Sequence, residues 1–303
     1  MSFWDKIEQQ ISTSLARPFK LKKQSAMGGG SINKANLIEG FMDENGHEKK
    51  ANFFIKINHK NRIEMFEAEA TGLNAIANTQ TIRVPYVLCS GIEGEQSYLL
   101  LEALPISAGD DDSASRLGQQ LANLHKNTVE QFGWKQNNTI GVTRQINTPI
   151  DKGTDNWIRF WREQRLGYQF ELAKQNGVAS SLLNKAEKLL ADLDRFFEGY
   201  EVEPSLLHGD LWSGNYAYLN NGEPVIYDPA LYYGDRETDI AMTELFGGFT
   251  TEFYQSYNKT WPLDKGYKQR KNLYNLYHIL NHYNMFGGGY AMQAENMLEQ
   301  LLV

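Results

Sequence analysis

The stretch LLHGDLWSGNYAYLNNGEPVIYDPALYYGD, residues 206–235, decides which fold and which chemistry this chain can support. It places Asn215 five positions after Asp210, and Asp228 eighteen positions after Asp210. The run between Asn215 and Asp228 has the pattern of two short strands joined by a turn. Because such a hairpin brings its two ends together, we expect the three polar side chains to meet at one site.

These three side chains are of the kinds that phosphoryl transfer needs. A hydroxyl nucleophile needs an orienting base, and the phosphates of ATP need magnesium held by hard oxygen ligands. Asp210 is the candidate base, and Asn215 and Asp228 are the candidate magnesium ligands. Taken alone, each of them can also be a residue that caps a loop, so a purely structural role stays open. Their combined order favours a phosphotransfer site.

A glycine-rich run upstream is a candidate for the phosphate-binding loop. The sequence MGGGSINKA holds Gly28, Gly29, Gly30 and Ser31 between two predicted strands. Because glycine has no Cβ, backbone amides in such a turn can approach a phosphate closely. We expect the ATP phosphates to bind here, although a run of this kind is often only a flexible turn.

Lys56 lies within the apolar run FFIKI, which predicts a strand. Burial of its neighbours would direct the ammonium group into a cleft, while an exposed strand lysine is the alternative. The later strand in YLLLEALP ends in a linker. The backbone of Glu102, Ala103 and Leu104 can hydrogen-bond an adenine edge there, although no residue type in this linker demands it.

A buried lysine needs an acidic partner, and the predicted helix over residues 62–79 offers three glutamates. Glu69 lies three residues after Phe66 and four before Leu73, so it shares their inward face. The other two, Glu64 and Glu67, fall toward the solvated side. The helical spacing therefore predicts an ion pair between Glu69 and the strand lysine.

Composition limits the class of protein. The chain has 303 residues, 41% hydrophobic residues and a net charge of −7, so it can bury a large core and has no general attraction for nucleic acid or anionic membranes. Its single cysteine, Cys89, excludes an internal disulfide framework. The N-terminus lacks the pattern of a signal peptide, and no apolar run reaches the length of a membrane span. We expect a cytoplasmic protein without nucleic-acid or membrane partners.

The order of predicted elements indicates an α+β fold with two lobes. Residues 1–15 predict an amphipathic helix, and the rest of the first hundred residues runs strands, helix, strands. After the acidic loop that holds Asp110, Asp111 and Asp112 the pattern is mostly helical. The predicted lobes are residues 1–104, small and β-rich, and 105–303, larger and mostly helical. Helices are expected over 113–127, 154–175, 179–199, 236–259 and 266–286.

These motifs, in this order, resemble the protein-kinase-like fold of small-molecule kinases, and more closely the fructosamine kinase (ketosamine kinase) family. The most specific segments are HGDLWSGN and the run FGWKQNNTIGVTRQINTPIDKGTDNWIRFWREQRLGYQ over 132–169. Aminoglycoside and choline kinases share the first segment but not the second. The resemblance implies ATP-dependent phosphorylation of the sugar 3-hydroxyl of ketosamines. The phosphorylated adduct falls apart, which links the activity to protein deglycation.

The resemblance also assigns roles and shows departures. Lys56 would balance charge on the ATP phosphates, and Trp212 would present an apolar face to a sugar. Ser31 stands where many relatives carry cysteine, so redox control through that loop is not implied. Gly209 replaces the arginine with which protein kinases read a phosphorylated activation loop. The run from Asp228 to the next predicted helix is short, so we expect an enzyme that needs no activating phosphorylation.

Three functions remain open at this point. The leading one is a kinase of small ketosamines or glycated proteins that uses ATP and magnesium. A nearer alternative is a kinase of another small alcohol, such as an aminoglycoside or choline. The alternative of another class is a catalytically silent nucleotide-binding scaffold. Retention of all five candidate side chains argues against the scaffold, because a scaffold has no chemical need for them: Lys56, Glu69, Asp210, Asn215 and Asp228.

Overall fold

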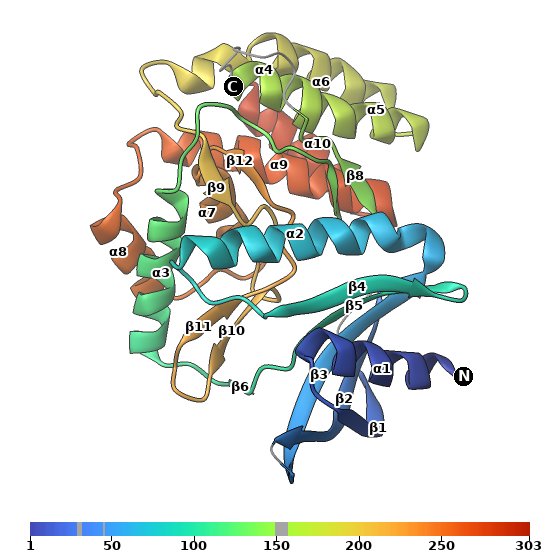
Figure 1. Cartoon of the computed structure of the whole chain (residues 1–303). Coiled ribbons are helices and arrows are strands. Elements are labelled where there is room, and N and C mark those ends of the chain that lie inside the picture. Colours follow the sequence, from blue (N-terminus) through green and yellow to red (C-terminus); the bar gives the residue numbers. More distant parts are fainter. Residues whose placement is uncertain (29–31, 45, 149–156) are drawn as a thin grey trace.

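A five-stranded antiparallel sheet forms the N-terminal lobe of the computed structural model, which describes residues 1–28, 32–44, 46–148 and 157–303. The strand order is β1-β2-β3-β5-β4. Figure 1 shows α2 (Ile63–Thr79) along one side of this sheet and α1 (Phe3–Leu15) along the other. The strands are β1 (Phe19–Met27), β2 (Lys34–Glu44), β3 (His47–His59), β4 (Val87–Glu93) and β5 (Gln96–Glu102).

Alternation along β5 explains how one sheet supports both helices. Leu99 and Leu101 belong to the apolar core beneath α2, whereas Tyr98 and Leu100 belong to the core beneath α1. Successive side chains of a strand point to opposite faces, so a run of apolar residues serves two layers. The sheet is therefore covered on both faces.

Helix α1 begins with reciprocal capping by Ser2 and Asp5, each side chain accepting a hydrogen bond from the other's backbone N–H. One turn apart, Ile7 and Ile11 are fully buried against the sheet. The predicted amphipathic helix is thus present and docked. Its apolar face completes the outer layer of the N-terminal lobe.

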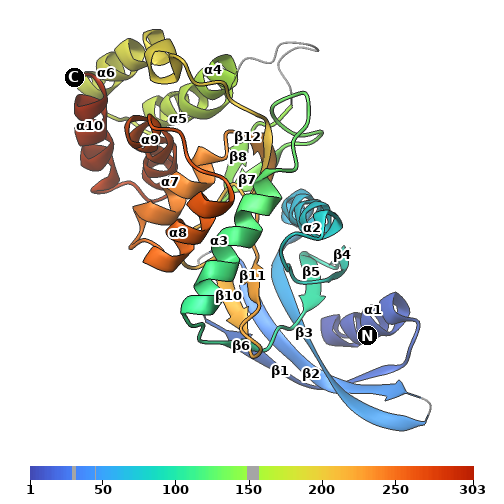
Figure 2. The same ribbon diagram turned by 90° about the vertical axis from the view of Figure 1, so that its left-hand side faces the viewer.

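The C-terminal lobe is mostly helical, and α2 lies between it and the sheet (Figures 1 and 2). Short strands hold its loops: β6 (Ile106–Ser107), β7 (Asn138–Ile140), β8 (Thr143–Gln145), β9 (Ser205–Leu207), β10 (Tyr216–Leu219), β11 (Pro224–Ile226) and β12 (Tyr232–Gly234). Its α-helices are α3 (Asp111–His125), α4 (Trp157–Phe160), α5 (Tyr168–Gln175), α6 (Ser180–Ala191), α7 (Glu237–Leu245), α8 (Thr251–Thr260), α9 (Tyr267–Phe286) and α10 (Tyr290–Leu301). A π-helical segment, Trp161–Gly167, joins α4 to α5, and 3₁₀ turns cover Lys60–Arg62 and Leu193–Phe197.

Two predicted elements of the C-terminal lobe were wrong. The helix expected over 236–259 is two helices, α7 and α8, because Gly247 and Gly248 adopt positive φ angles of 98° and 75° between them. The acidic run expected as a loop starts α3: Asp110 caps the helix by accepting from the Ser113 N–H at 2.8 Å. Helix α10 was not predicted at all.

Other predicted boundaries shifted without changing the layout. The helix expected over 154–175 is described from Trp157, and the one expected over 179–199 ends in a 3₁₀ turn. Strand β5 ends at Glu102, and β6 pairs with β10 of the C-terminal lobe. The lobe boundary near 104 stays a prediction. Among the described residues, no helix has the length and apolar character to cross a membrane.

Candidate active site

Lys56 joins the two lobes at their interface. It lies on β3 with its side chain 8% exposed, and its Nζ lies 2.7 Å from Glu69 Oε1 on α2. The same ammonium group contacts Asp228 Oδ1, which comes from the other lobe. The structure therefore contains the ion pair that helical spacing predicted, while Glu64 and Glu67 are exposed.

The charges of Lys56, Glu69 and Asp228 affect one another's protonation. Burial alone would lower the pKa of Lys56, but the charges of Asp228 and Glu69 outweigh burial and raise that pKa. Burial raises the pKa of Glu69 to about 7 despite the attraction of Lys56. The ammonium group is thus firmly charged, and its two carboxylates compete for it.

Asp210 and Asn215 lie together in the loop between β9 and β10. Asn215 is 6% exposed, and its Nδ2 donates to the Asp210 carbonyl oxygen at 2.8 Å and to Asp210 Oδ2 at 3.4 Å. Burial and the nearby charge of Asp228 raise the pKa of Asp210 to about 7. A carboxylate with such a pKa can accept a proton near neutral pH.

Asp239 holds this loop from α7, and sequence reasoning missed it. Its carboxylate accepts from the His208 N–H at 2.7 Å and from the Gly209 N–H at 2.8 Å. It also contacts His125 Nε2 at 3.1 Å. The available signal was an acid within an apolar helix, but Glu237 shares that feature, so the pattern alone could not select Asp239.

The glycine before Asp210 is required by geometry. Gly209 has a φ of +84°, and a Cβ there would overlap the Ala230 carbonyl oxygen. The adjacent His208 contacts the Tyr227 carbonyl oxygen through Nε2 at 2.9 Å. The loop that holds Asp210 is therefore packed directly against the segment that follows Asp228.

Asp228 and Asn215 leave oxygens free for a cation. Asp228 has a φ of +59°, an uncommon conformation for a side chain with Cβ, and its side chain is 44% exposed. Asp228 Oδ1 contacts Lys56, whereas no donor in the described part of the chain contacts Asp228 Oδ2 or Asn215 Oδ1. One carboxylate oxygen and one amide oxygen are hard ligands that suit magnesium.

Comparison with known proteins assigns this arrangement to a family. The model of the family described as fructosamine kinase matches residues 3–303. The chain belongs to the fructosamine kinase family. A chain of Synechocystis sp. named as a probable ketoamine kinase is 48% identical over 99% of this chain and 97% of its own length. The chloroplastic protein-ribulosamine 3-kinase of Arabidopsis thaliana is 41% identical over 98% and 88%.

Solved structures agree with this fructosamine kinase assignment. A candidate fructosamine-3-kinase of Haemophilus somnus 129PT superposes with a TM-score of 0.87 and 31% identity, covering 99% of this chain and 98% of the other. An ADP-bound aminoglycoside phosphotransferase, APH(2'')-Ib, has a TM-score of 0.63 at 10% identity, covering 99% of this chain and 98% of the other, and shows the shared fold alone. The predicted two-lobed, protein-kinase-like α+β fold is confirmed.

The predicted nucleotide-binding elements of this family member are described in part. Gly28 is exposed at the end of β1, and the predicted residues Gly29, Gly30 and Ser31 lie outside the described residues. In the linker after β5, the Glu102 side chain forms an ion pair with Arg83, and its N–H donates to the Tyr86 carbonyl oxygen at 2.9 Å. Two linker residues, Ala103 and Leu104, are half-buried. No acceptor in the described chain contacts the N–H of Ala103 or Leu104, so these two amides are better placed than that of Glu102 to meet a ligand.

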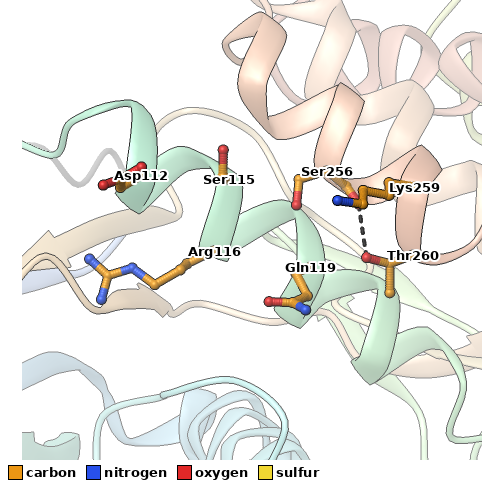
Figure 3. Close-up of a pocket in the computed structure, with 7 residues that line it drawn as sticks. All are labelled: Asp112, Ser115, Arg116, Gln119, Ser256, Lys259 and Thr260. Carbon is orange, nitrogen blue, oxygen red and sulfur yellow. Dashed lines mark hydrogen bonds between the residues drawn. The ribbon is translucent and has the colours of Figure 1, made fainter.

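Two further features are the predicted substrate contact Trp212 and a hollow in the C-terminal lobe. Trp212 is 39% exposed, and its ring lies against Gly214, where a Cβ would overlap it. A separate hollow between α3 and α8 contains none of the predicted site residues (Figure 3). Seven polar side chains line it: Asp112, Ser115, Arg116, Gln119, Ser256, Lys259 and Thr260.

Proposed function

We propose that this chain is an ATP-dependent ketosamine kinase that phosphorylates the sugar 3-hydroxyl. One observation carries the proposal: Lys56 contacts both Glu69 and Asp228, next to the hydrogen-bonded pair Asp210 and Asn215. This juxtaposition unites a phosphate-binding cation, an acidic base and free oxygen ligands in one place. A scaffold would have no chemical reason to keep a buried cation between competing carboxylates.

The proposed roles follow from charge and position. Lys56 is charged and buried, so it is suited to bind phosphate oxygens, and Glu69 holds it in place. Asp210 orients the sugar hydroxyl and accepts its proton as the oxygen attacks the γ-phosphorus of ATP; the bond between that phosphorus and ADP breaks. Within the described chain, Asp210 Oδ1 has no donor, which leaves it available to the hydroxyl.

Asn215 and Asp228 would hold magnesium. The free Asn215 Oδ1 and Asp228 Oδ2 atoms are hard donors, and the Asp228 side chain is partly exposed. When bound, magnesium would neutralise charge on the ATP phosphates. Glycine-loop residues Gly28, Gly29, Gly30 and Ser31 would meet those phosphates, and the linker of Glu102, Ala103 and Leu104 would meet the adenine.

The substrate is proposed to be a ketosamine, either free or on a glycated protein. The names of the relatives, ketoamine kinase and protein-ribulosamine 3-kinase, support this class. An exposed indole such as Trp212 offers an apolar face to a sugar ring. Phosphorylation of a protein-bound ketosamine would link the enzyme to deglycation. A cytoplasmic location stays a prediction from the sequence.

The decisive experiment is a substrate panel. Purified enzyme with magnesium and ATP is offered fructosyl-lysine, ribulosyl-lysine, choline and an aminoglycoside, and ADP release is measured together with the mass of the phosphorylated product. ADP release and a phosphosugar with the ketosamines alone would support the proposal. Turnover of choline or the aminoglycoside would favour the nearer alternative, and nucleotide binding without turnover of any acceptor would favour the scaffold.

A further inference from the structure

We infer that Gln145 is a positioning residue that fixes Asp210 and Asp228 relative to each other, an inference that rests on the proposed kinase function. Gln145 lies at the end of β8, within the 132–169 segment, and is 1% exposed. Its Nε2 donates to the Ala230 carbonyl oxygen at 2.9 Å. That single carbonyl group lies at the junction of the two loops that carry the reacting groups.

Ala230 touches both loops. It follows Asp228 by two residues, across Pro229, so the position of its carbonyl group limits the backbone of Asp228. The same oxygen lies against Gly209, where even a Cβ would overlap it, and Gly209 directly precedes Asp210. A shift of Ala230 would therefore move one carboxylate against the other.

Both polar atoms of the Gln145 side chain form hydrogen bonds. Its Nε2 also donates to Asn138 Oδ1 at 2.9 Å, and its Oε1 accepts from Tyr277 Oη at 2.8 Å. Asn138 in turn donates to the Leu231 carbonyl oxygen at 2.8 Å. Two neighbouring carbonyl groups after Asp228 are thus held by the two strands of one small hairpin, β7 and β8.

A buried cation fixes the end of that hairpin. Arg165 is fully buried in the π-helical segment and donates to the Ile146 carbonyl oxygen at 2.6 Å and to Asn147 Oδ1 at 2.7 Å. Its guanidinium carbon lies 4.1 Å from the centroid of the Tyr232 ring, two residues beyond Ala230. The hairpin and the segment after Asp228 are therefore braced by the same side chain.

The arrangement explains why the short run after Asp228 can stay ordered without an activating modification. Tyr233 exchanges two backbone hydrogen bonds with Gly133, both 2.8 Å long. Residues 230, 231, 232 and 233 thus each contact a residue of the 132–169 segment. Buried hydrogen-bond networks are rigid where their members are satisfied, as both side-chain polar atoms of Gln145 are, so small displacements of the carboxylates are resisted.

The test compares Gln145→Met with Gln169→Met. Gln169 is fully buried, its Nε2 donates to Asn281 Oδ1 at 3.3 Å, and its Oε1 accepts from Asn284 Nδ2 at 2.7 Å. It interacts with Tyr277 as Gln145 does, but within the described chain it has no hydrogen bond to residues 228–231, so both variants remove a buried amide of the same size. We expect kcat with a ketosamine to fall about 10- to 100-fold in Gln145→Met, the cost of misplacing reacting groups, while the KM for ATP changes by less than about threefold. The loss in melting temperature should match that of Gln169→Met, which keeps its kcat.

A second readout separates positioning from general destabilisation. Because Gln145 donates to the Ala230 carbonyl oxygen and Gln169 does not, kcat should fall with a nearly unchanged KM for ATP in Gln145→Met and not in Gln169→Met. If Gln145→Met does not fold, Asn138→Asp, which loses the donor to Leu231, should give a smaller kcat loss in the same direction. Equal kcat values in the Gln145 and Gln169 variants would overturn the inference, whereas an inactive wild-type enzyme would instead overturn the proposed function.

Discussion

Lys56 and Arg165 are both buried cations, but their surroundings are opposite. Lys56 is 7% exposed and contacts two carboxylates, one from each lobe. Arg165 is fully buried, and no carboxylate of the described chain lies within ion-pair distance of it. Backbone and amide oxygens and the faces of Phe160 and Tyr232 surround it instead.

These opposite surroundings suit opposite roles: Lys56 is proposed to bind a ligand, whereas Arg165 holds the structure. A cation between two carboxylates can exchange one of them for a phosphate at little cost, because its partners already compete. A cation held by carbonyl oxygens and aromatic rings has donors in fixed directions, which suits the planar guanidinium and not an ammonium group. The charge at Lys56 should therefore matter for turnover, and the shape of Arg165 for stability.

The largest effect is expected from Lys56→Met. Loss of the cation should lower kcat by about 10²- to 10³-fold, the usual effect of removing one electrostatic donor from a transition state. Its effect on stability should stay within the ordinary range of about 0.5–3 kcal/mol, because Glu69, with a pKa already raised to about 7, can take up a proton. Steady-state kinetics and urea unfolding measure the two quantities. A stable variant with wild-type kcat would show that Lys56 does not act on the phosphates.

The pH dependence of Asp210 should be next in size. Its folded pKa of about 7 lies above the ordinary value of 3.8, so between these values the folded enzyme holds a proton that the unfolded chain has lost. Stability from this residue is therefore full at low pH and falls as pH rises toward 7, by at most about 1.4 kcal/mol per pH unit. Asp210→Asn lacks this titration.

The measurement is urea unfolding of wild type and Asp210→Asn at pH 5, 6, 7 and 8, without nucleotide or magnesium. The advantage of the variant should grow up to about pH 7 and then level off. Titrating groups far from Asp210 cancel in the difference between the two proteins. If the difference in unfolding free energy stays constant over the whole pH range, the folded structure does not raise the pKa of Asp210.

Arg165→Lys should affect stability more than chemistry. Lysine keeps the charge but cannot donate in two fixed directions while lying flat on Tyr232, so at least one buried oxygen loses its donor. The expected loss is about 1–3 kcal/mol of unfolding free energy, with an unchanged KM for ATP. Arg144→Lys, at an exposed position of β8, is the matched control and should change stability by less than about 0.5 kcal/mol. Equal stability of the two variants would contradict the contrast.

The same two regions show what the sequence could and could not predict. Lys56 and Glu69 were predictable because strand alternation and helical phase each limit a side chain to one side, and local periodicity carries that information. The proximity of Asp210, Asn215 and Asp228 was predictable because a single hairpin joins Asn215 to Asp228. Asp239 and Gln145 were missed because their partners are backbone groups far along the chain, which leave no periodic signal.

The broken helix teaches a related point. The apolar pattern continued through residues 236–259, but the backbone freedom of two adjacent glycines, Gly247 and Gly248, separated it into α7 and α8. The apolar pattern of a sequence indicates which face of a helix is buried. It does not indicate where a helix ends when the residues that form the turn lie within the pattern. The predicted fold survived because the burial pattern was right on both sides of the break.

The smallest effect should distinguish two neighbouring glutamates on α2. Glu69→Gln keeps the size and one acceptor for Lys56 but removes one of its two negative partners, so Lys56 should turn toward Asp228. We expect about a tenfold loss in kcat/KM for ATP, since misplacing a phosphate-binding group is costly. Glu67→Gln, on the exposed side of the same helix, should stay within about twofold of wild type. A larger loss in kcat/KM for Glu67→Gln than for Glu69→Gln would mean that Glu69 does not position Lys56.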